Sequence, residues 1–148
     1  MIEKMGFEKN KRIHKKYKNV WVFGTLNGRE CHFRSKLEHK LAKYLELLIN
    51  NGHIKDAFHE DTTFKFPDSS WLVDFSVRNN DDTFEYFECK GFVEADTKRK
   101  LNLLGKYRPE VEVTMVISDK KGVDKLGVRA TSCCKRVCTI AEITKGVF

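Results

Sequence analysis

The spacing of hydrophobic residues along this chain changes from a helical period to an alternating one. Between residues 35 and 50, apolar side chains recur every three or four positions, which predicts an amphipathic helix. Gly52 then supplies a C-terminal stop for this helix. The predicted buried stripe of the helix consists of Leu37, Leu41, Tyr44, Leu45 and Leu48.

Strand-like segments occupy the middle of the chain. Residues 71–78 and 83–90 are apolar and rich in aromatic side chains, and the polar segment 78–82 between them contains Asn79-Asn80-Asp81-Asp82. Such a segment is typical of a hairpin loop, so the two strands are predicted to be antiparallel neighbours. The other predicted elements are strands near 20–26, at 56–66 and at 111–118, a helix at 97–107, a short helix around 122–136, and a last strand or helix near 137–143.

This order of elements predicts the fold class. A helix, antiparallel strands, a second helix and a further strand are typical of an α/β fold in which a mixed central sheet is flanked by helices. A chain of 148 residues is long enough for one such domain, and it contains no internal repeat. We therefore expect a basic N-terminal arm at 1–18, followed by a single domain at 19–148.

The charge of the chain favours a polyanionic partner. Its net charge is +7, and a protein that neutralises phosphates gains free energy from the counterions that it releases. Basic residues gather in the N-terminal arm and again at the start of the 97–107 helix, for which Asp96 is the expected N-cap. A solvated, frayed terminus would have the same composition as the arm, so both interpretations of it remain open. The candidate DNA-binding residues are Lys11, Arg12, Lys15, Lys16, Arg34, Lys98 and Arg99.

Several classes of protein are disfavoured by the composition. No run of about 18 apolar residues is present, and the N-terminus lacks the apolar segment of a secretion signal, so a cytoplasmic protein without a membrane span is expected. The cysteine count is five, and an odd count argues against a disulfide framework. Cys133, Cys134 and Cys138 offer one ligand pair for zinc and no second pair, so buried or free thiols are expected there.

The strongest chemical signal in the sequence is the pair Asp74 and Glu88, with Lys90 two positions after Glu88. Strand side chains alternate between faces, so Glu88 and Lys90 point one way, while Phe87 and Cys89 point toward the core. A hairpin would bring Asp74 beside Glu88. A solvent-facing hairpin would carry the same charges without chemistry. Both strands are otherwise apolar, however, and a charge in a buried strand needs a partner.

Two carboxylates and a lysine at neighbouring strand ends predict a metal-dependent phosphodiesterase site. Mg²⁺ and Mn²⁺ prefer carboxylate oxygens. A cation between Asp74 and Glu88 would polarise a scissile phosphate and lower the pKa of a bound water. Lys90 would then orient the attacking water or neutralise the charge that develops on the phosphate.

Glu38 is a third candidate metal ligand. It lies beside the buried stripe of the 35–50 helix, so it is expected at the margin of the core. The sequence from Ser35 to Glu38 also matches a capping box, in which the Glu38 carboxylate would bond the backbone N–H of Ser35. Both roles remain open. All five histidines are expected at the surface or at the boundary of the core, and His32 or His39, which flank Glu38, is the candidate for a position near the site.

The residues around these candidates carry a specific resemblance. The segments Phe33-Arg34-Ser35-Lys36-Leu37-Glu38, Val73-Asp74-Phe75 and Glu88-Cys89-Lys90-Gly91-Phe92 follow the order and spacing found in endonuclease I, the four-way-junction resolvase of T-odd bacteriophages, and the likeness runs from about residue 31 to 125. Endonuclease I is a PD-(D/E)xK nuclease, and Val73 stands where that motif usually has proline.

The resemblance implies a restriction-endonuclease-like fold in which Glu38, Asp74, Glu88 and Lys90 are catalytic. Its three carboxylates would bind Mg²⁺ or Mn²⁺. It also implies a homodimer that acts on branched double-stranded DNA, in the cytoplasm of a bacterial host cell if the protein is encoded by a phage.

The expected function is thus a metal-dependent endonuclease that resolves four-way (Holliday) and other branched DNA junctions by paired phosphodiester hydrolysis. A duplex, repair or transposon-type nuclease is an alternative, favoured by a segment at 66–71 that is shorter than the family's inter-lobe bridge and by the absence of its lysine-rich C-terminal tail. A second alternative is a non-catalytic basic DNA-binding module, in which Glu38 is only a helix cap and Lys90 only a phosphate contact.

Overall fold

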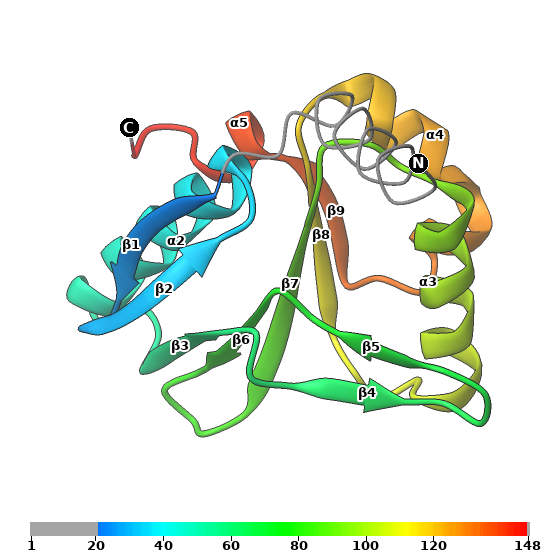
Figure 1. Cartoon of the computed structure of the whole chain (residues 1–148), viewed down its shortest axis with the longest axis horizontal. Helices are drawn as coiled ribbons and strands as arrows, with labels where there is room; N and C mark the ends of the chain where they lie inside the picture. Colours follow the sequence, from blue (N-terminus) through cyan, green and yellow to red (C-terminus); the bar gives the residue numbers. More distant parts are fainter. Residues whose placement is uncertain (1–20, 148) are drawn as a thin grey trace, which may run out of the picture.

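A five-stranded sheet of mixed direction lies at the centre of the computed structural model, which describes residues 21–147 (Figure 1). The strand order is β3-β6-β7-β8-β9. The first three strands of this order are antiparallel neighbours, and β7, β8 and β9 run parallel to one another. The strands are β3 (Asp56–His59), β6 (Phe75–Arg78), β7 (Phe84–Lys90), β8 (Val113–Ile117) and β9 (Arg136–Thr139).

Helices cover both faces of this sheet, as Figure 1 shows. One face packs against α2 (Lys36–Asn50) and the short α5 (Ile140–Ile143), and the other face packs against α3 (Ala95–Tyr107) and α4 (Lys120–Thr131). β8 is buried on both faces, as expected for a strand whose two parallel neighbours are each reached through a helix. The predicted α/β class with a mixed central sheet flanked by helices is therefore confirmed.

The helix that was predicted at 35–50 forms as α2. Leu41 and Leu45 are fully buried, and Leu37, Tyr44 and Leu48 pack partly buried at the edge of the same core. Ser35 is the N-cap, and its side chain accepts a hydrogen bond from the Glu38 N–H. Gly52 has a φ of +76°, which suits the chain reversal at the end of the helix.

Two small hairpins complete the fold. The first pairs β1 (Val22–Leu26) with β2 (Arg29–Phe33), and buries Leu26 and Phe33 against α2. β1 matches the strand predicted near 20–26, whereas β2 was not predicted. Its signal is Asn27-Gly28, both with positive φ, which is the chemistry of a two-residue hairpin turn.

The second hairpin changes the strands predicted at 56–66 and 71–78. Each of these splits in two, and the distal halves form β4 (Thr63–Lys65) and β5 (Ser70–Leu72). The two halves face different cores: Phe75 and Val77 pack on the α2 side, while Phe64 and Trp71 pack on the α3 side. The chain must therefore bend between them, and it does so at residues 60–62 and 73–74.

Three further boundaries differ from the sequence prediction. Glu94, and not Asp96, is the N-cap of α3, because the helix begins earlier and Asp96 forms ion pairs with Arg99 and Lys100 within it. The helix expected at 122–136 spans 120–131, with Asp119 as its N-cap. The region 137–143 contributes both β9 and α5. The predicted basic arm at 1–18 lies outside the described residues.

No helix among residues 21–147 is long and apolar enough to cross a membrane.

The packing of α2 generates a stability prediction. Leu45 is fully buried, so Leu45→Ala removes apolar contacts and leaves a cavity, which should lower the free energy of unfolding by about 2–5 kcal/mol. Leu48→Ala, at the margin of the same stripe, is the matched control and should cost clearly less. Urea unfolding followed by circular dichroism measures both. Equal losses in the two variants would contradict this assignment of the buried stripe.

Candidate active site

Asp74 and Glu88 are joined by reciprocal hydrogen bonds at the point where β5 gives way to β6. Phe75 pairs with Phe87 in the β6–β7 register, so the residues that precede and follow this pair meet. The Asp74 backbone N–H donates to Glu88 Oε1 at 2.9 Å, and the Cys89 N–H donates to Asp74 Oδ2 at 2.8 Å. The prediction that the hairpin brings Asp74 beside Glu88 is confirmed.

Glu88 is deeply buried and well supplied with donors. It is 3% exposed, and its Oε2 accepts a hydrogen bond from Trp71 Nε1 at 3.1 Å. Lys90 Nζ lies 3.6 Å from the same oxygen, and about a third of its side chain remains exposed. The hairpin is therefore not a solvent-facing one with incidental charges, because its glutamate is held inside the protein by three separate groups.

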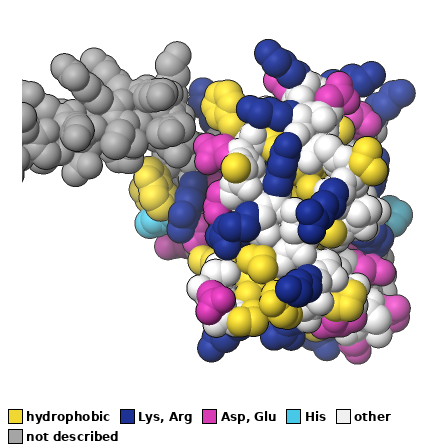
Figure 2. Space-filling view, turned by 90° about the vertical axis from the view of Figure 1, so that its right-hand side faces the viewer, with side chains coloured by type: hydrophobic (Ala, Val, Ile, Leu, Met, Phe, Trp, Pro, Cys, Tyr) yellow, Lys and Arg dark blue, Asp and Glu magenta, His cyan; other side chains and the backbone are white. Residues whose placement is uncertain are grey.

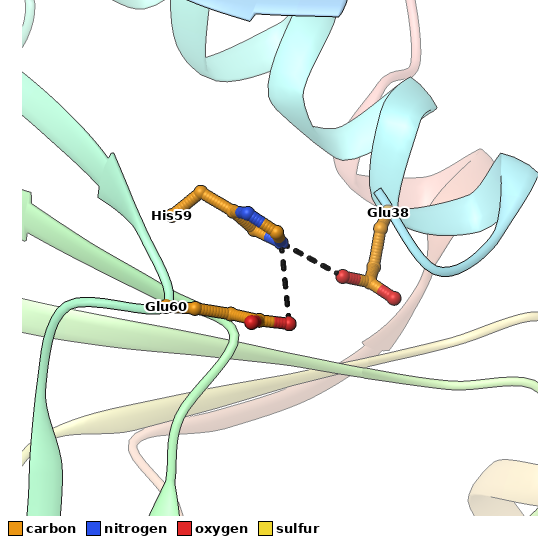
Figure 3. A group of neighbouring side chains, drawn as sticks. All are labelled: Glu38, His59 and Glu60. Carbon is orange, nitrogen blue, oxygen red and sulfur yellow. Dashed lines mark hydrogen bonds and ion pairs between the residues drawn. The ribbon is translucent and has the colours of Figure 1, made fainter. Parts of the chain in front are cut away.

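The Glu38 carboxylate enters the same region from the first turn of α2. Its backbone N–H is capped by Ser35 Oγ at 3.1 Å, so half of the predicted capping box is present. The carboxylate itself turns inward, and its Oε1 lies 3.1 Å from His59 Nε2 (Figure 3). The Glu38 side chain is only 7% exposed, so the carboxylate is available to the interior site.

One cavity of about 630 Å³ joins these groups. Glu38, Asp74, Glu88 and Lys90, the four residues expected to be catalytic, all contribute to its lining. They come from α2, from the β5–β6 junction and from β7, so three parts of the fold converge on it. Further polar and charged residues line its walls: Arg34, Ser35, Glu60, Glu94, Asp96 and Lys100.

The electrostatics of the cavity favour a bound cation. Burial raises the pKa of Asp74 well above its ordinary value, and the negative charges of Glu88 and Glu38 raise it further. Burial also raises the pKa of Glu88, opposed by Lys90 and by the hydrogen bonds from the Asp74 N–H and the Trp71 indole. In this poorly solvated space, burial and neighbouring negative charge thus disfavour the ionised form of these carboxylates.

The donor set suits a hard divalent cation. Each carboxylate oxygen of Asp74 and Glu88 that accepts one N–H keeps a second lone pair. Carboxylate oxygens of this kind are the usual ligands of Mg²⁺ and Mn²⁺. Asp74 and Glu88 could therefore hold a metal between them. The carboxylate of Glu38, the third predicted ligand, groups instead with His59 and Glu60, with one ligand atom of each within 4.8 Å of the others.

His59 and Glu60 are functional candidates that the sequence analysis missed. His32 or His39 was the candidate for a position near the site, but the His32 ring packs on Phe23, and His39 lines a different cavity, beside lysines of α2. His59 takes that position instead. The signal was the strand register. His59 pairs with Phe75 where β3 runs antiparallel to β6, so the next residue, Glu60, lies opposite Asp74. The Glu60 N–H donates to the Asp74 carbonyl at 2.8 Å.

The candidate DNA-binding residues are placed unevenly. Arg34 lines the cavity and bonds Glu60 Oε1 through Nε at 2.9 Å. On α3, Lys100 lines the cavity, whereas Lys98 and Arg99 do not. Figure 2 shows Lys and Arg side chains spread over the face that carries α3 and α4. Lys11, Arg12, Lys15 and Lys16 lie outside the described residues.

The cysteines do not form a second centre of this kind. All five are free thiols, and Cys89 packs into the core on the α2 side, as predicted. Burial, with a contribution from Cys133, raises the pKa of Cys134 to about 12. Among residues 21–147, no cysteine belongs to a group of three or more potential metal ligands.

No protein-family model matches this chain, and no curated protein matches it. Its function is therefore inferred from the geometry and the chemistry of the described residues. The features that bear on function are the paired carboxylates, the adjacent lysine and the shared cavity.

The raised pKa values predict how stability depends on pH without divalent cations. A carboxyl group whose pKa is higher in the folded state stabilises the protein below its unfolded pKa, about 3.8 for Asp74 and 4.5 for Glu88, and this stability is lost as pH rises through the folded value. Asp74→Asn removes one group of this pair.

We therefore expect the unfolding free energy of Asp74→Asn, relative to the unsubstituted protein, to increase as pH rises from about 4 toward neutrality. Urea unfolding in EDTA at a series of pH values measures this difference. Carboxylates elsewhere are common to both proteins and cancel. A difference that stays constant with pH would contradict the assignment.

Proposed function

We propose that this protein is a Mg²⁺- or Mn²⁺-dependent DNA endonuclease with a restriction-endonuclease-like fold, and that its substrate is branched DNA, above all the four-way junction. The observation that supports this most strongly is the buried pair of Asp74 and Glu88, with Lys90 3.6 Å from the glutamate and Glu38 lining the same cavity. The element order α2, β3, β6, β7, α3, β8 agrees with that fold.

A divalent cation held by Asp74 and Glu88, with Glu38 beside them, would supply Lewis acidity to the scissile phosphate and lower the pKa of an attacking water. Lys90 Nζ projects from the same face of β7 as Glu88, and its partial exposure lets it reach a phosphate oxygen or the water. In that position it offsets the negative charge that develops on the phosphate as the reaction proceeds.

Water attacks the phosphorus in line with the bond to the 3′ oxygen. The new oxygen–phosphorus bond leaves a 5′-phosphate, and the departing 3′ oxygen takes up a proton to give a 3′-hydroxyl. No covalent enzyme intermediate is needed. Trp71 and the Asp74 N–H keep the Glu88 carboxylate fixed during these steps, which is the preorganisation that a phosphoryl-transfer site requires.

The charge distribution supports a DNA substrate. The net charge is +7, and the α3–α4 face beside the cavity carries many Lys and Arg side chains (Figure 2). Such surfaces contact phosphates and fix the position of the duplex without reading its bases. A homodimer would give two sites related by two-fold symmetry, which matches the two symmetric nicks needed to resolve a junction.

A second candidate function is cleavage of ordinary duplex DNA, as in repair or transposon-type nucleases. One observation favours it: Glu38, Asp74, Glu88 and Lys90 all line the cavity within a single chain. The β4–β5 hairpin folds back on its own α3, with Phe66 and Tyr107 ring centroids 6.4 Å apart. A site that is complete in one subunit does not depend on strand exchange, and so does not require the symmetry of a junction.

A non-catalytic DNA-binding module is the weaker alternative. Buried carboxylates with raised pKa values cost stability, and a protein that only contacted phosphates would gain nothing from them.

The decisive experiment compares an end-labelled immobile four-way junction with a linear duplex of matching sequence, each with Mg²⁺ and with EDTA. We expect metal-dependent paired nicks near the branch point. Lys90→Ala should lower the cleavage rate by about a hundredfold or more, because it removes a charge aimed at the transition state. Lys65→Ala, an exposed lysine on β4, is the matched control and should cleave normally.

The outcomes separate the three hypotheses. Equal cutting of junction and duplex would assign the protein to the general or repair nucleases. Tight junction binding without cleavage in Mg²⁺ or Mn²⁺ would overturn the enzymatic proposal and leave a DNA-binding module.

A further inference from the structure

A second group of ligands lies beside Asp74 and Glu88 and shares Glu38 with the proposed catalytic residues. Glu38, His59 and Glu60 each offer one ligand atom, and these atoms all lie within 4.8 Å of one another (Figure 3). His59 Nε2 lies 3.1 Å from Glu38 Oε1 and 3.7 Å from Glu60 Oε1. The His59 side chain is 7% exposed and that of Glu60 is 23% exposed, so the group is shielded but remains accessible from the cavity.

Each member is held by contacts outside the group. Glu38 follows the capped N-terminus of α2. The His59 ring packs against Phe33 and Phe75, with centroid distances of 4.9 and 5.2 Å. Glu60 is fixed through its backbone N–H, which donates to the Asp74 carbonyl. A nitrogen and two carboxylates are therefore positioned by the fold itself and not by their attraction for one another alone.

We propose that Glu38, His59 and Glu60 form a second cation site, distinct from the Asp74–Glu88 pair, which binds a divalent transition-metal ion such as Mn²⁺ or Zn²⁺ in preference to Mg²⁺. The preference follows from the imidazole nitrogen, because Mg²⁺ favours oxygen ligands alone, whereas transition-metal ions bind imidazole well. Any catalytic role of this site rests on the proposed nuclease function, whereas cation binding by the three residues does not.

Binding requires two local changes. His59 must present an unprotonated Nε2, so a neutral ring keeps its proton on Nδ1, and a charged ring releases one proton to solvent. Arg34 Nε, now 2.9 Å from Glu60 Oε1, must give way to the cation, and its side chain is 57% exposed and free to turn outward. The incoming ion replaces one positive charge beside Glu60 with two.

The position of this site gives it an influence on the first one. Glu38 belongs to the group and also acts electrostatically on Asp74, and the Glu60 backbone is bonded directly to that of Asp74. A cation at the second site would therefore offset negative charge next to the proposed catalytic metal.

The test is Mn²⁺ binding to the full-length protein, followed by pulsed electron paramagnetic resonance, which detects coupling of Mn²⁺ to an imidazole nitrogen. We expect this coupling in the unsubstituted protein and in Asp74→Asn, and its loss in His59→Gln. Zn²⁺ should displace the coupled Mn²⁺ at a lower concentration than Mg²⁺ does. His39→Gln is the matched control, because His39 adjoins Glu38 in sequence but lines a different cavity.

His59→Gln removes a ring that packs among aromatic side chains, so misfolding would also abolish the coupling in this variant. A second variant separates the two causes. Glu60→Gln leaves that packing intact and should weaken the nitrogen-coupled Mn²⁺ site by about tenfold or more. If the coupling persists in His59→Gln, or if Glu60→Gln binds Mn²⁺ with unchanged affinity, the second site does not exist.

Failure of this inference is distinguishable from failure of the proposed function. If the junction is cleaved normally but bound Mn²⁺ shows no nitrogen coupling, the proposal of a second site is overturned and the nuclease proposal stands. Nitrogen-coupled Mn²⁺ in a protein that cuts no DNA would instead support the second site and overturn the nuclease proposal.

Discussion

The burial of two like-charged carboxylates against each other is the constraint on which the rest of the site depends. Asp74 and Glu88 remain inside the protein because each carboxylate accepts a hydrogen bond from a backbone N–H of the other's segment. The second oxygen of Glu88 accepts a hydrogen bond from the Trp71 indole and forms an ion pair with Lys90. These bonds form where the chain leaves the central sheet at Asp74, so the bend in the strands and the burial of the two carboxylates occur at the same place.

The sequence was sufficient for the parts of the fold in which periodicity and burial agree. The stripe of α2 follows from its helical spacing, and the meeting of Asp74 with Glu88 follows from the polar loop between two strands. The bend was not predictable in this way. Trp71, Val73, Phe75 and Val77 alternate without interruption, yet the first two pack on the α3 side and the last two on the α2 side. Alternation predicts that a side chain is buried, but it does not predict whether the side chain packs in the core on the α2 side or in the core on the α3 side. His59 and Glu60 were missed for the same reason, because their position depends on where the paired strands end.

The site combines rigid and adjustable parts in a manner that suits charge-dependent chemistry. Glu88 is enclosed and fixed by several donors, whereas Lys90 and Arg34 are partly exposed and can move. The enclosed anions define where positive charge is needed, and under the proposed function the partly exposed Lys90 and Arg34 would give way there to a metal ion or a phosphate. This division resembles the general distinction between preorganised groups and groups that respond to a ligand.

The β4–β5 hairpin connects the candidate active site to a distant part of the surface. Its turn lies at Phe66–Ser69, near the end of α3, while its base carries Trp71, Asp74 and Glu60. The hairpin therefore carries two contacts of the carboxylate pair: the hydrogen bond from the Trp71 indole to Glu88 and the backbone bond between Glu60 and Asp74. Because one hairpin carries both contacts, any displacement of its turn relative to α3 would move the Trp71 indole and the Glu60–Asp74 backbone bond together.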